Sequence, residues 1–518
     1  MTSVPAMLLL FFLLSVAVRA QENQSNLIGL GSSLSPSTHH TSWLSSTGLF
    51  AFGFYPHGYG FAVGIWLIGQ PQNTLVWTAN RDDPPVSSNA TLDFTKDGQL
   101  LLRSKQLGQE KPVIELREIA VSASMLDSGN FVFYNNNSRV IWQSFDFPTD
   151  TLLGGQNLSS GDKLISSVST SNGSSGRFYL AMQSDGNLVA YPVNSTAAPE
   201  DAYWSSNTLG ISATLNLNHR GLLGFRNSAG RNVRTVANGT SYSGESETII
   251  YRATLDADGV FRLYSHSFRI GDDNPTVSPE WSSLQNQCEV KGFCGFNSFC
   301  SSNGSTKADC FCFPGFVFVN PDMRFLGCYR SFNDEDCRRK ELSLSYSIAS
   351  CNNTTLGGFP YSMLSMSNED CSNSCLKDCD CGAALYSNGV CSRRKLPLTY
   401  GRVNQNETTT LYLRVGGDYN YKPPIPGDPI VMIESKKKLI QILACANGVI
   451  MHRLKSIGTL GRMEAFIVLV SSCLYVMGFS CLSGPLNWLS ETFRSGAQDV
   501  GLLFDHHWVQ HDDELCDG

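Results

Sequence analysis

The sequence predicts a mainly β protein that ends in small, disulfide-rich modules. The chain of 518 residues is too long for a single hydrophobic core. Only 16% of the residues are charged, compared with about 25% in ordinary globular domains, and glycine contributes 46 residues. A polar turn followed by a short apolar strand recurs between residues 30 and 280, and no convincing amphipathic helix interrupts it. These observations favour short strands joined by many turns.

The first 20 residues are typical of a secretory signal peptide. Residues Ala6 to Val18 are apolar, and Val18-Arg19-Ala20 offers a small-residue cleavage site. A transmembrane anchor is the alternative, but the apolar stretch is short for one. We therefore expect a secreted or plasma-membrane protein that faces the outside of the cell.

The turn-and-strand theme predicts stacked small sheets with internal pseudo-symmetry. Spacings of about 30 to 40 residues between copies are typical of such repeats. The sequence therefore predicts two consecutive all-β modules, over residues 21–155 and 156–286. The turns of the five copies are Asp97-Gly98-Gln99, Ser128-Gly129-Asn130, Asp185-Gly186-Asn187, Arg220-Gly221-Leu222 and Asp258-Gly259-Val260.

The third copy places Gln183, Asp185, Asn187, Val189 and Tyr191 at alternate positions. On one straight strand these side chains would share a face, but the first and last would lie roughly 26 Å apart, too far for one small ligand. Asp185-Gly186 is a two-residue hairpin signal, and a reversal there would bring the polar groups together. Amide, carboxylate and phenol groups beside an aliphatic side chain suit a polyhydroxy ligand with one apolar face.

This Q-x-D-x-N-x-V-x-Y pattern resembles the mannose-binding motif of bulb-type lectins at all five positions. Residues 76–86 contain Trp77-Thr78-Ala79-Asn80-Arg81, which resembles the W-x-A-N-R signature of plant bulb-type lectin modules. Residues 142–153 resemble the W-Q-S-F-D-x-P-T-D-T-L-L signature that closes such a module. Over roughly residues 27–440 the chain resembles the ectodomain of plant G-type lectin S-receptor-like serine/threonine-protein kinases. The resemblance implies two tandem bulb-type lectin modules with a β-prism fold.

The resemblance also implies a role for each motif residue. Asp185 and Asn187 would hold O2 of the sugar, Gln183 would hold O3, Tyr191 would reach O4, and Val189 would pack on the carbon face. The ligands would be mannose-containing glycans or glycoproteins. The alternative is that this segment only builds a stable hairpin, as its degraded copies at residues 95–103 and 126–134 do.

Cysteines concentrate behind the β modules, as in secreted modules that are stabilised by disulfides. Of the 17 cysteines, none precedes Cys288 and thirteen fall between Cys288 and Cys391. The first six, in residues 287–329, resemble an EGF-like module. That resemblance implies the pairs Cys288 with Cys300, Cys294 with Cys310, and Cys312 with Cys328. Zinc is the alternative, but C-x2-C pairs are absent. No acidic residue directly precedes Cys288, so we expect no calcium.

The second cysteine cluster, in residues 337–415, resembles a PAN/apple module. Cys371, Cys375 and Cys379 have helical spacing, which predicts one face of a short helix. Because seven is odd, one thiol stays free or pairs outside the module, and the sequence leaves the pairing open. The seven residues are Cys337, Cys351, Cys371, Cys375, Cys379, Cys381 and Cys391.

Eleven N-x-S/T sequons predict a glycoprotein surface. They begin at Asn23, Asn89, Asn136, Asn157, Asn172, Asn194, Asn238, Asn303, Asn352, Asn353 and Asn406.

The C-terminal part changes character. A linker is predicted over residues 416–463, a candidate transmembrane segment over 464–489 and a tail over 490–518. Residues 465–482 are long enough to span a bilayer, but basic residues on their N-terminal side oppose an outside N-terminus. From residue 440 onward no kinase motif is recognised, so the chain is expected to lack the kinase domain of the family that it resembles.

These features together predict a carbohydrate-binding recognition protein without catalytic residues, cofactor or metal. A net charge of -7 without a basic cluster argues against nucleic acid as a partner. One alternative is an interaction ectodomain without sugar binding that forms a homodimer, or a heterodimer with receptor kinases. Another is a truncated form of a receptor serine/threonine kinase. A glycosidase ranks last, because no pair of carboxylates stands out.

Overall fold

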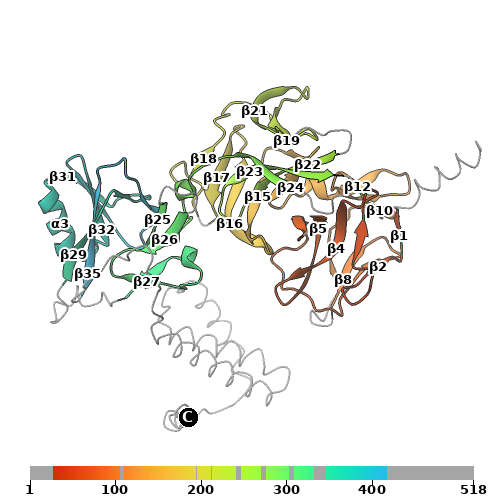
Figure 1. Cartoon of the computed structure of the whole chain (residues 1–518), viewed down its shortest axis with the longest axis horizontal. Helices are drawn as coiled ribbons and strands as arrows, with labels where there is room; N and C mark the ends of the chain where they lie inside the picture. Colours follow the sequence, from red (N-terminus) through yellow and green to blue (C-terminus); the bar gives the residue numbers. More distant parts are fainter. Residues whose placement is uncertain are drawn as a thin grey trace, which may run out of the picture. The chain divides into compact units, whose positions relative to one another are not determined.

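The computed structural model describes residues 27–416, except for 70, 105–109, 194, 212, 241–246, 270–275, 303–307 and 332–345. All of these residues belong to one compact unit, Met1–Tyr421. Strands dominate this part of the chain, which confirms the mainly β prediction (Figure 1). The predicted signal peptide, Cys337 and the segments after residue 416 lie outside the described residues, as do the sequon asparagines Asn23, Asn194 and Asn303.

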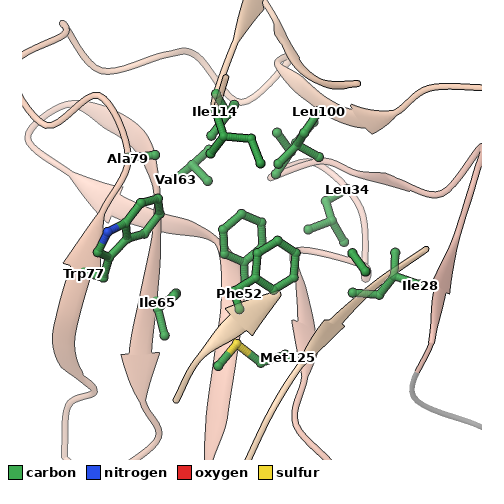
Figure 2. Close-up of a cluster of buried hydrophobic side chains, with 14 of the residues drawn as sticks. Ile28, Leu34, Phe52, Val63, Ile65, Trp77, Ala79, Leu100, Ile114 and Met125 are labelled. Carbon is green, nitrogen blue, oxygen red and sulfur yellow. The ribbon is translucent and has the colours of Figure 1, made fainter. Parts of the chain in front are cut away.

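Residues 28–143 form the first prism, in which three antiparallel four-stranded sheets enclose one apolar core. Alternation of side chains along each strand produces the core: in β7 (Thr91–Phe94), Leu92 and Phe94 are buried, whereas Thr91 and Asp93 are only partly buried. Within this core the rings of Phe52 and Phe131 stack with their centroids 3.8 Å apart. Figure 2 shows Phe52 among other buried side chains of this cluster. In sheet order the strands are β1 (Ile28–Gly29), β10 (Ser122–Met125), β11 (Phe131–Tyr134) and β12 (Val140–Gln143); β2 (Ser33–Leu34), β7 (Thr91–Phe94), β8 (Leu100–Arg103) and β9 (Glu110–Pro112); and β3 (Ser42–Leu44), β4 (Phe50–His57), β5 (Gly60–Leu67) and β6 (Thr74–Thr78).

Residues 151–282 form the second prism, which repeats this architecture around its own core. A short 3-10 helix, η1 (Ser144–Asp146), precedes it. Thr151 already pairs with Thr254 in this prism, so the prism begins before the predicted boundary at residue 155. In sheet order the strands are β13 (Thr151–Leu153), β22 (Glu247–Leu255), β23 (Phe261–Arg269) and β24 (Thr276–Ser282); β14 (Asn157–Leu158), β19 (Thr214–Leu217), β20 (Leu222–Arg226) and β21 (Asn232–Asn238); and β15 (Lys163–Ser169), β16 (Asn172–Met182), β17 (Leu188–Pro192) and β18 (Trp204–Ser205).

The five predicted turn copies all form turns with the same hydrogen bond. In each, the glycine N–H donates to the carbonyl three residues earlier, and the glycine has a positive φ. At Gly186, for example, φ is 86°, and a Cβ atom would lie 2.0 Å from the carbonyl oxygen of Ile211. Only glycine therefore fits at this position.

The W-x-A-N-R signature joins the two prisms. Trp77 Nε1 donates to the carbonyl of Phe147 at 2.8 Å. The guanidinium of Arg81 donates to backbone carbonyls of β15 and β16, including Ile165 at 2.8 Å and Gly173 at 2.9 Å. The signature residues thus have a structural role at this contact.

The first cysteine-rich segment contains three disulfides, Cys288–Cys300, Cys294–Cys310 and Cys312–Cys328. These are the pairs that the EGF-like resemblance implies. The disulfides take the place of a large apolar core in a segment of little more than forty residues. Its elements are η2 (Gln287–Glu289), β25 (Ser298–Ser302), β26 (Ala308–Cys312), β27 (Phe316–Phe318), η3 (Arg324–Leu326) and β28 (Cys328–Arg330).

The second cysteine-rich segment packs one α-helix, α3 (Asn368–Lys377), against a five-stranded sheet. Cys371 and Cys375 lie on the buried face of α3 and pair with Cys391 and Cys381. Placing Cys379 on the same helix is wrong, because α3 ends at Lys377; Cys379 is disulfide-bonded from the following loop. In sheet order the five strands are β29 (Tyr346–Asn352), β35 (Thr410–Gly416), β32 (Ala383–Ser387), β33 (Val390–Arg394) and β31 (Ser362–Ser365). Two further strands, β30 (Thr354–Thr355) and β34 (Gly401–Val403), join β25 and β26 in a separate four-stranded sheet.

Within the described residues Cys351 is the free thiol, and burial raises its pKa to about 11. No helix in this part of the chain is long and apolar enough to cross a membrane. None of the sequon asparagines in the described ranges is buried. Asn89, Asn136, Asn157, Asn238, Asn352 and Asn406 are exposed, and Asn172 and Asn353 are half-buried.

Candidate carbohydrate-binding site

The five motif residues lie on the hairpin of β16 and β17 (Figure 1). In its register, Tyr191 is opposite Tyr179, and Val189 is opposite Ala181. The loop runs from Gln183 to Asn187, so the prediction of a two-residue hairpin is wrong. Its closing bonds join Gly186 N–H to the Gln183 carbonyl and Gln183 N–H to the Asn187 carbonyl, and this longer loop suits a glycine at positive φ.

The reversal brings the two ends of the motif together, as the sequence predicts. Gln183 Nε2 donates to the Tyr191 hydroxyl at 3.1 Å, although the two residues are eight positions apart. Asp185 Oδ1 accepts a hydrogen bond from the Asn187 backbone N–H at 2.9 Å, which stabilises the turn. The first and last motif residues are therefore in direct contact and not some 26 Å apart, as they would be on one straight strand.

Each polar motif residue keeps at least one group available to a ligand. The carbonyl oxygen of the Asn187 side chain accepts from Ser206 Oγ at 3.1 Å and from Thr208 N–H at 3.2 Å, which leaves its Nδ2 as a donor. No hydrogen bond within the described residues uses Asp185 Oδ2 or Gln183 Oε1. The Tyr191 hydroxyl, which accepts from Gln183, keeps its proton to donate.

The site is shallow. Asp185 is exposed, whereas Val189 and Tyr191 are each only 3% exposed, so a sugar would contact little apolar surface on either. Tyr179, which the sequence motif does not include, stacks on Tyr191 with ring centroids 5.4 Å apart and remains partly exposed. Tyr179 therefore extends the aromatic surface beside the polar groups. Its position follows from the hairpin register, once the turn is placed.

The copy at residues 126–134 forms the same kind of hairpin but leaves its asparagine side chain unavailable to a ligand. Its asparagine, Asn130, is buried, and its Nδ2 donates to Gln143 Oε1 at 2.9 Å. The side-chain oxygen of Asn130 accepts from Ser144 Oγ and from Phe145 N–H. In this copy the polar side chain stabilises the prism and does not face a ligand.

In the copy at residues 256–264 the charged side chains pair with one another inside the prism. Arg262 contacts Asp256 at 2.5 Å and Asp258 at 2.7 Å, and all three side chains are mostly buried. The Tyr264 hydroxyl donates to Asp256 at 2.7 Å. Because its charges are paired with each other, this cluster is structural.

Behind this cluster lies a buried histidine that predicts a pH dependence of stability. His266 is 1% exposed, and its Nε2 accepts from Arg252 Nε at 2.9 Å. Burial and the neighbouring guanidinium lower the pKa of His266 to about 3.

The unfolded chain therefore binds a proton at His266 below about pH 6.5, whereas the folded chain does not. The stability that depends on this histidine is lost as pH falls from about 6.5 towards 3. Between pH 6.5 and 5.0 the wild type should lose about 2 kcal/mol more stability than His266→Gln. Thermal unfolding of both proteins at the two pH values measures this difference, and equal pH dependence of the two would contradict the assignment.

In the part of the chain that the structure describes, no three His, Cys, Asp or Glu side chains gather where they could hold a metal ion. The five motif residues include one carboxylate, that of Asp185.

Two protein-family models match the chain. The model described as D-mannose binding lectin matches residues 74–172, and the S-locus glycoprotein domain matches residues 223–320. Neither range includes residues 183–191. The matches therefore support a lectin domain and do not assign sugar binding to the β16–β17 hairpin.

Curated relatives align with most of this chain. It is 32% identical over 430 residues to the G-type lectin S-receptor-like serine/threonine-protein kinase LECRK1 of Oryza sativa subsp. japonica, an alignment that covers 76% of this chain and 51% of the relative. It is 26% identical over 506 residues to the G-type lectin S-receptor-like serine/threonine-protein kinase RLK1 of Arabidopsis thaliana, which covers 91% of this chain and 58% of that relative. The chain thus spans little more than half the length of these relatives.

Among solved structures, part of the chain is similar to the mannose-specific agglutinin from snowdrop (Galanthus nivalis) bulbs, which was solved with methyl-alpha-D-mannoside. The two are 25% identical, the match covers 22% of this chain and 88% of the agglutinin, and the TM-score is 0.17.

Proposed function

We propose that this chain is a recognition protein that binds mannose-type glycans outside the cell. The premise is that the chain carries the lectin and S-locus glycoprotein domains and is homologous to the G-type lectin S-receptor-like kinases. The disulfide-bonded segments and the exposed sequons support a secreted or plasma-membrane location. For the described residues we propose no catalysis.

The observation that supports sugar binding most is the set of free polar groups on the β16–β17 hairpin. Asp185 would contribute most, because its carboxylate forms charge-assisted hydrogen bonds with sugar hydroxyls. Gln183 and Asn187 add amide groups, and Tyr191 adds a hydroxyl donor. A single shallow site of this kind binds weakly, so useful affinity needs a multivalent glycan or a dimeric receptor.

Retention of the purified chain on a mannan column tests this proposal. The wild type should be retained and eluted by free mannose. Asp185→Asn should weaken binding about tenfold or more, because it removes the charge but keeps the Oδ1 acceptor that stabilises the turn. The matched control is Asp162→Asn, since Asp162 accepts from Ser159 N–H at 2.8 Å in a turn outside the motif. Equal retention of Asp185→Asn and the wild type would contradict the site.

The second candidate function is that of an interaction ectodomain without sugar binding. It is favoured by the edge strand β31, where Met363 is 62% exposed and Leu364 is 50% exposed, with Phe359 nearby at 76%. Exposed apolar side chains on a sheet edge are typical of a surface that pairs with another chain. Self-association of a wild-type protein that mannan does not retain would make this function the leading one.

A further inference from the structure

A polar hollow of about 740 Å³ lies on the β14–β19–β20 sheet of the second prism, and none of the five motif residues lines it. Thr214, Asn216 and Asn218 alternate along β19 and its following turn, so they share one face. Arg226 lies opposite Thr214 on β20 and lines the same hollow. Its size falls within the range of about 300 to 1,000 Å³ that is usual for ligand pockets.

This hollow borders the next hairpin copy, and two of the five positions that correspond to the motif, Asn218 and Arg226, line it. The turn closes in the same way, with Gly221 N–H donating to the Asn218 carbonyl. At the motif positions, however, Arg220 replaces the aspartate, Leu222 replaces the asparagine and Arg226 replaces the tyrosine. This copy therefore carries two arginines where the motif has its carboxylate and its phenol, so it cannot bind a sugar as the first site would.

The charge in this hollow is unpaired. The guanidinium of Arg226 forms no ion pair or hydrogen bond with the described residues, and its Nε is buried without an acceptor. Among the described residues that line the hollow there is no aspartate or glutamate. Arg262 in the neighbouring copy differs, because two carboxylates neutralise it. A half-buried, unpaired guanidinium favours a planar anion, above all a carboxylate.

The rest of the lining suits hydroxyl groups. Asn216 is 6% exposed; its Nδ2 donates to Asn157 Oδ1 at 2.8 Å, but its own side-chain oxygen is buried without a donor. Because that oxygen has almost no accessible surface, the polar groups that a ligand could contact are those of the other lining residues. They include amide, hydroxyl and imidazole groups, from Asn218, Asn227, Ser228 and His219. A ligand for this hollow would therefore combine hydroxyls with a carboxylate.

We propose that this hollow is a second saccharide site, which binds an acidic sugar of the uronate class. Arg226 pairs with the carboxylate, and the asparagine side chains hydrogen-bond the hydroxyls. This site is independent of the mannose-type site on the β16–β17 hairpin, and either can exist without the other.

Calorimetric titration of the full chain with trigalacturonate and with a glucuronate trimer tests the proposal. Asn157 begins a sequon and lines the hollow, so a glycan there would compete with the ligand. All proteins in the test therefore carry Ser159→Ala, which removes the sequon and keeps Asn157. The arms are this protein, Arg226→Gln, and the control Arg231→Gln, whose exposed arginine lies on the loop after β20.

We expect at least one uronate trimer to bind and its methyl ester to bind about tenfold more weakly or worse, since the ester removes the charge. Arg226→Gln should weaken binding of the acid by a similar factor, whereas Arg231→Gln and Asp185→Asn should stay within about twofold. Thermal unfolding shows that each variant is folded. No binding of either acid, equal binding of acid and ester, or unchanged binding by Arg226→Gln would each overturn the proposal. Loss of mannan retention in Asp185→Asn with intact uronate binding separates the two sites.

Discussion

Replacing Arg81 by alanine is expected to destabilise the folded prisms by about 3 kcal/mol. Its guanidinium donates to the carbonyls of Gly173, Ile165, Ser166 and Ser174 and to Ser167 Oγ, at distances from 2.8 to 3.3 Å. Hydrogen bonds from a charged group each contribute about 1.5 to 3 kcal/mol, and removing the donor leaves part-buried carbonyls unpaired. The contributions are not additive, so we expect a total near that of one or two strong bonds.

Differential scanning calorimetry measures this effect as a fall in Tm of roughly 6 to 12 °C. Arg81→Lys should recover only part of the loss, because one ammonium group cannot reach acceptors arranged around a planar guanidinium. The matched control is Arg139→Ala, which removes an exposed ion pair with Glu118 and should cost less than about 1 kcal/mol. A Tm for Arg81→Ala within the range of that control would show that the signature arginine does not hold the prisms together.

Much of the fold follows from the sequence because glycine at positive φ is a local requirement. Each Gly in the repeated turns is needed where it stands, so the repeat is visible before any tertiary contact is known. The residue at which the second prism begins is harder to predict from the sequence, because Thr151 pairs with a residue of β22 about a hundred positions later in the chain. Likewise, helical spacing places Cys379 beyond Cys375, but Lys377 ends the helix and Asp378 has an extended backbone.

The candidate site, too, could be predicted from the sequence only in part. Gln183, Asp185 and Tyr191 could be found because they are close in the chain and the turn determines their register. Ser206 and Thr208, which hold the Asn187 side chain, come from a later segment without a motif of its own. Which copies keep their polar groups free depends on such distant partners, and spacing alone cannot reveal them.

The copy at residues 256–264 provides the second large effect: Arg262→Met should destabilise the second prism by about 3 to 5 kcal/mol. The substitution leaves the mostly buried carboxylates of Asp256 and Asp258 without their cation, and removing one partner of a buried ion pair has a cost of this order. Burial already raises the pKa of Asp256, and the loss of Arg262 would raise it further. Calorimetry should show a fall in Tm that is smaller at low pH, where protonation of these carboxylates removes the unpaired charge.

Two variants separate this charge effect from the loss of packing. Arg269→Met removes an arginine that is 69% exposed and pairs with Glu247, so it should cost less than about 1 kcal/mol. Asp258→Asn in the Arg262→Met background removes one of the two unpaired carboxylates and should restore part of the stability. If the double variant is as unstable as Arg262→Met, the cost arises from packing. If the double variant regains stability, the ion pairs stabilise this hairpin copy. The copy at residues 183–191 differs, because its one carboxylate has no cation beside it among the described residues and remains free for a ligand.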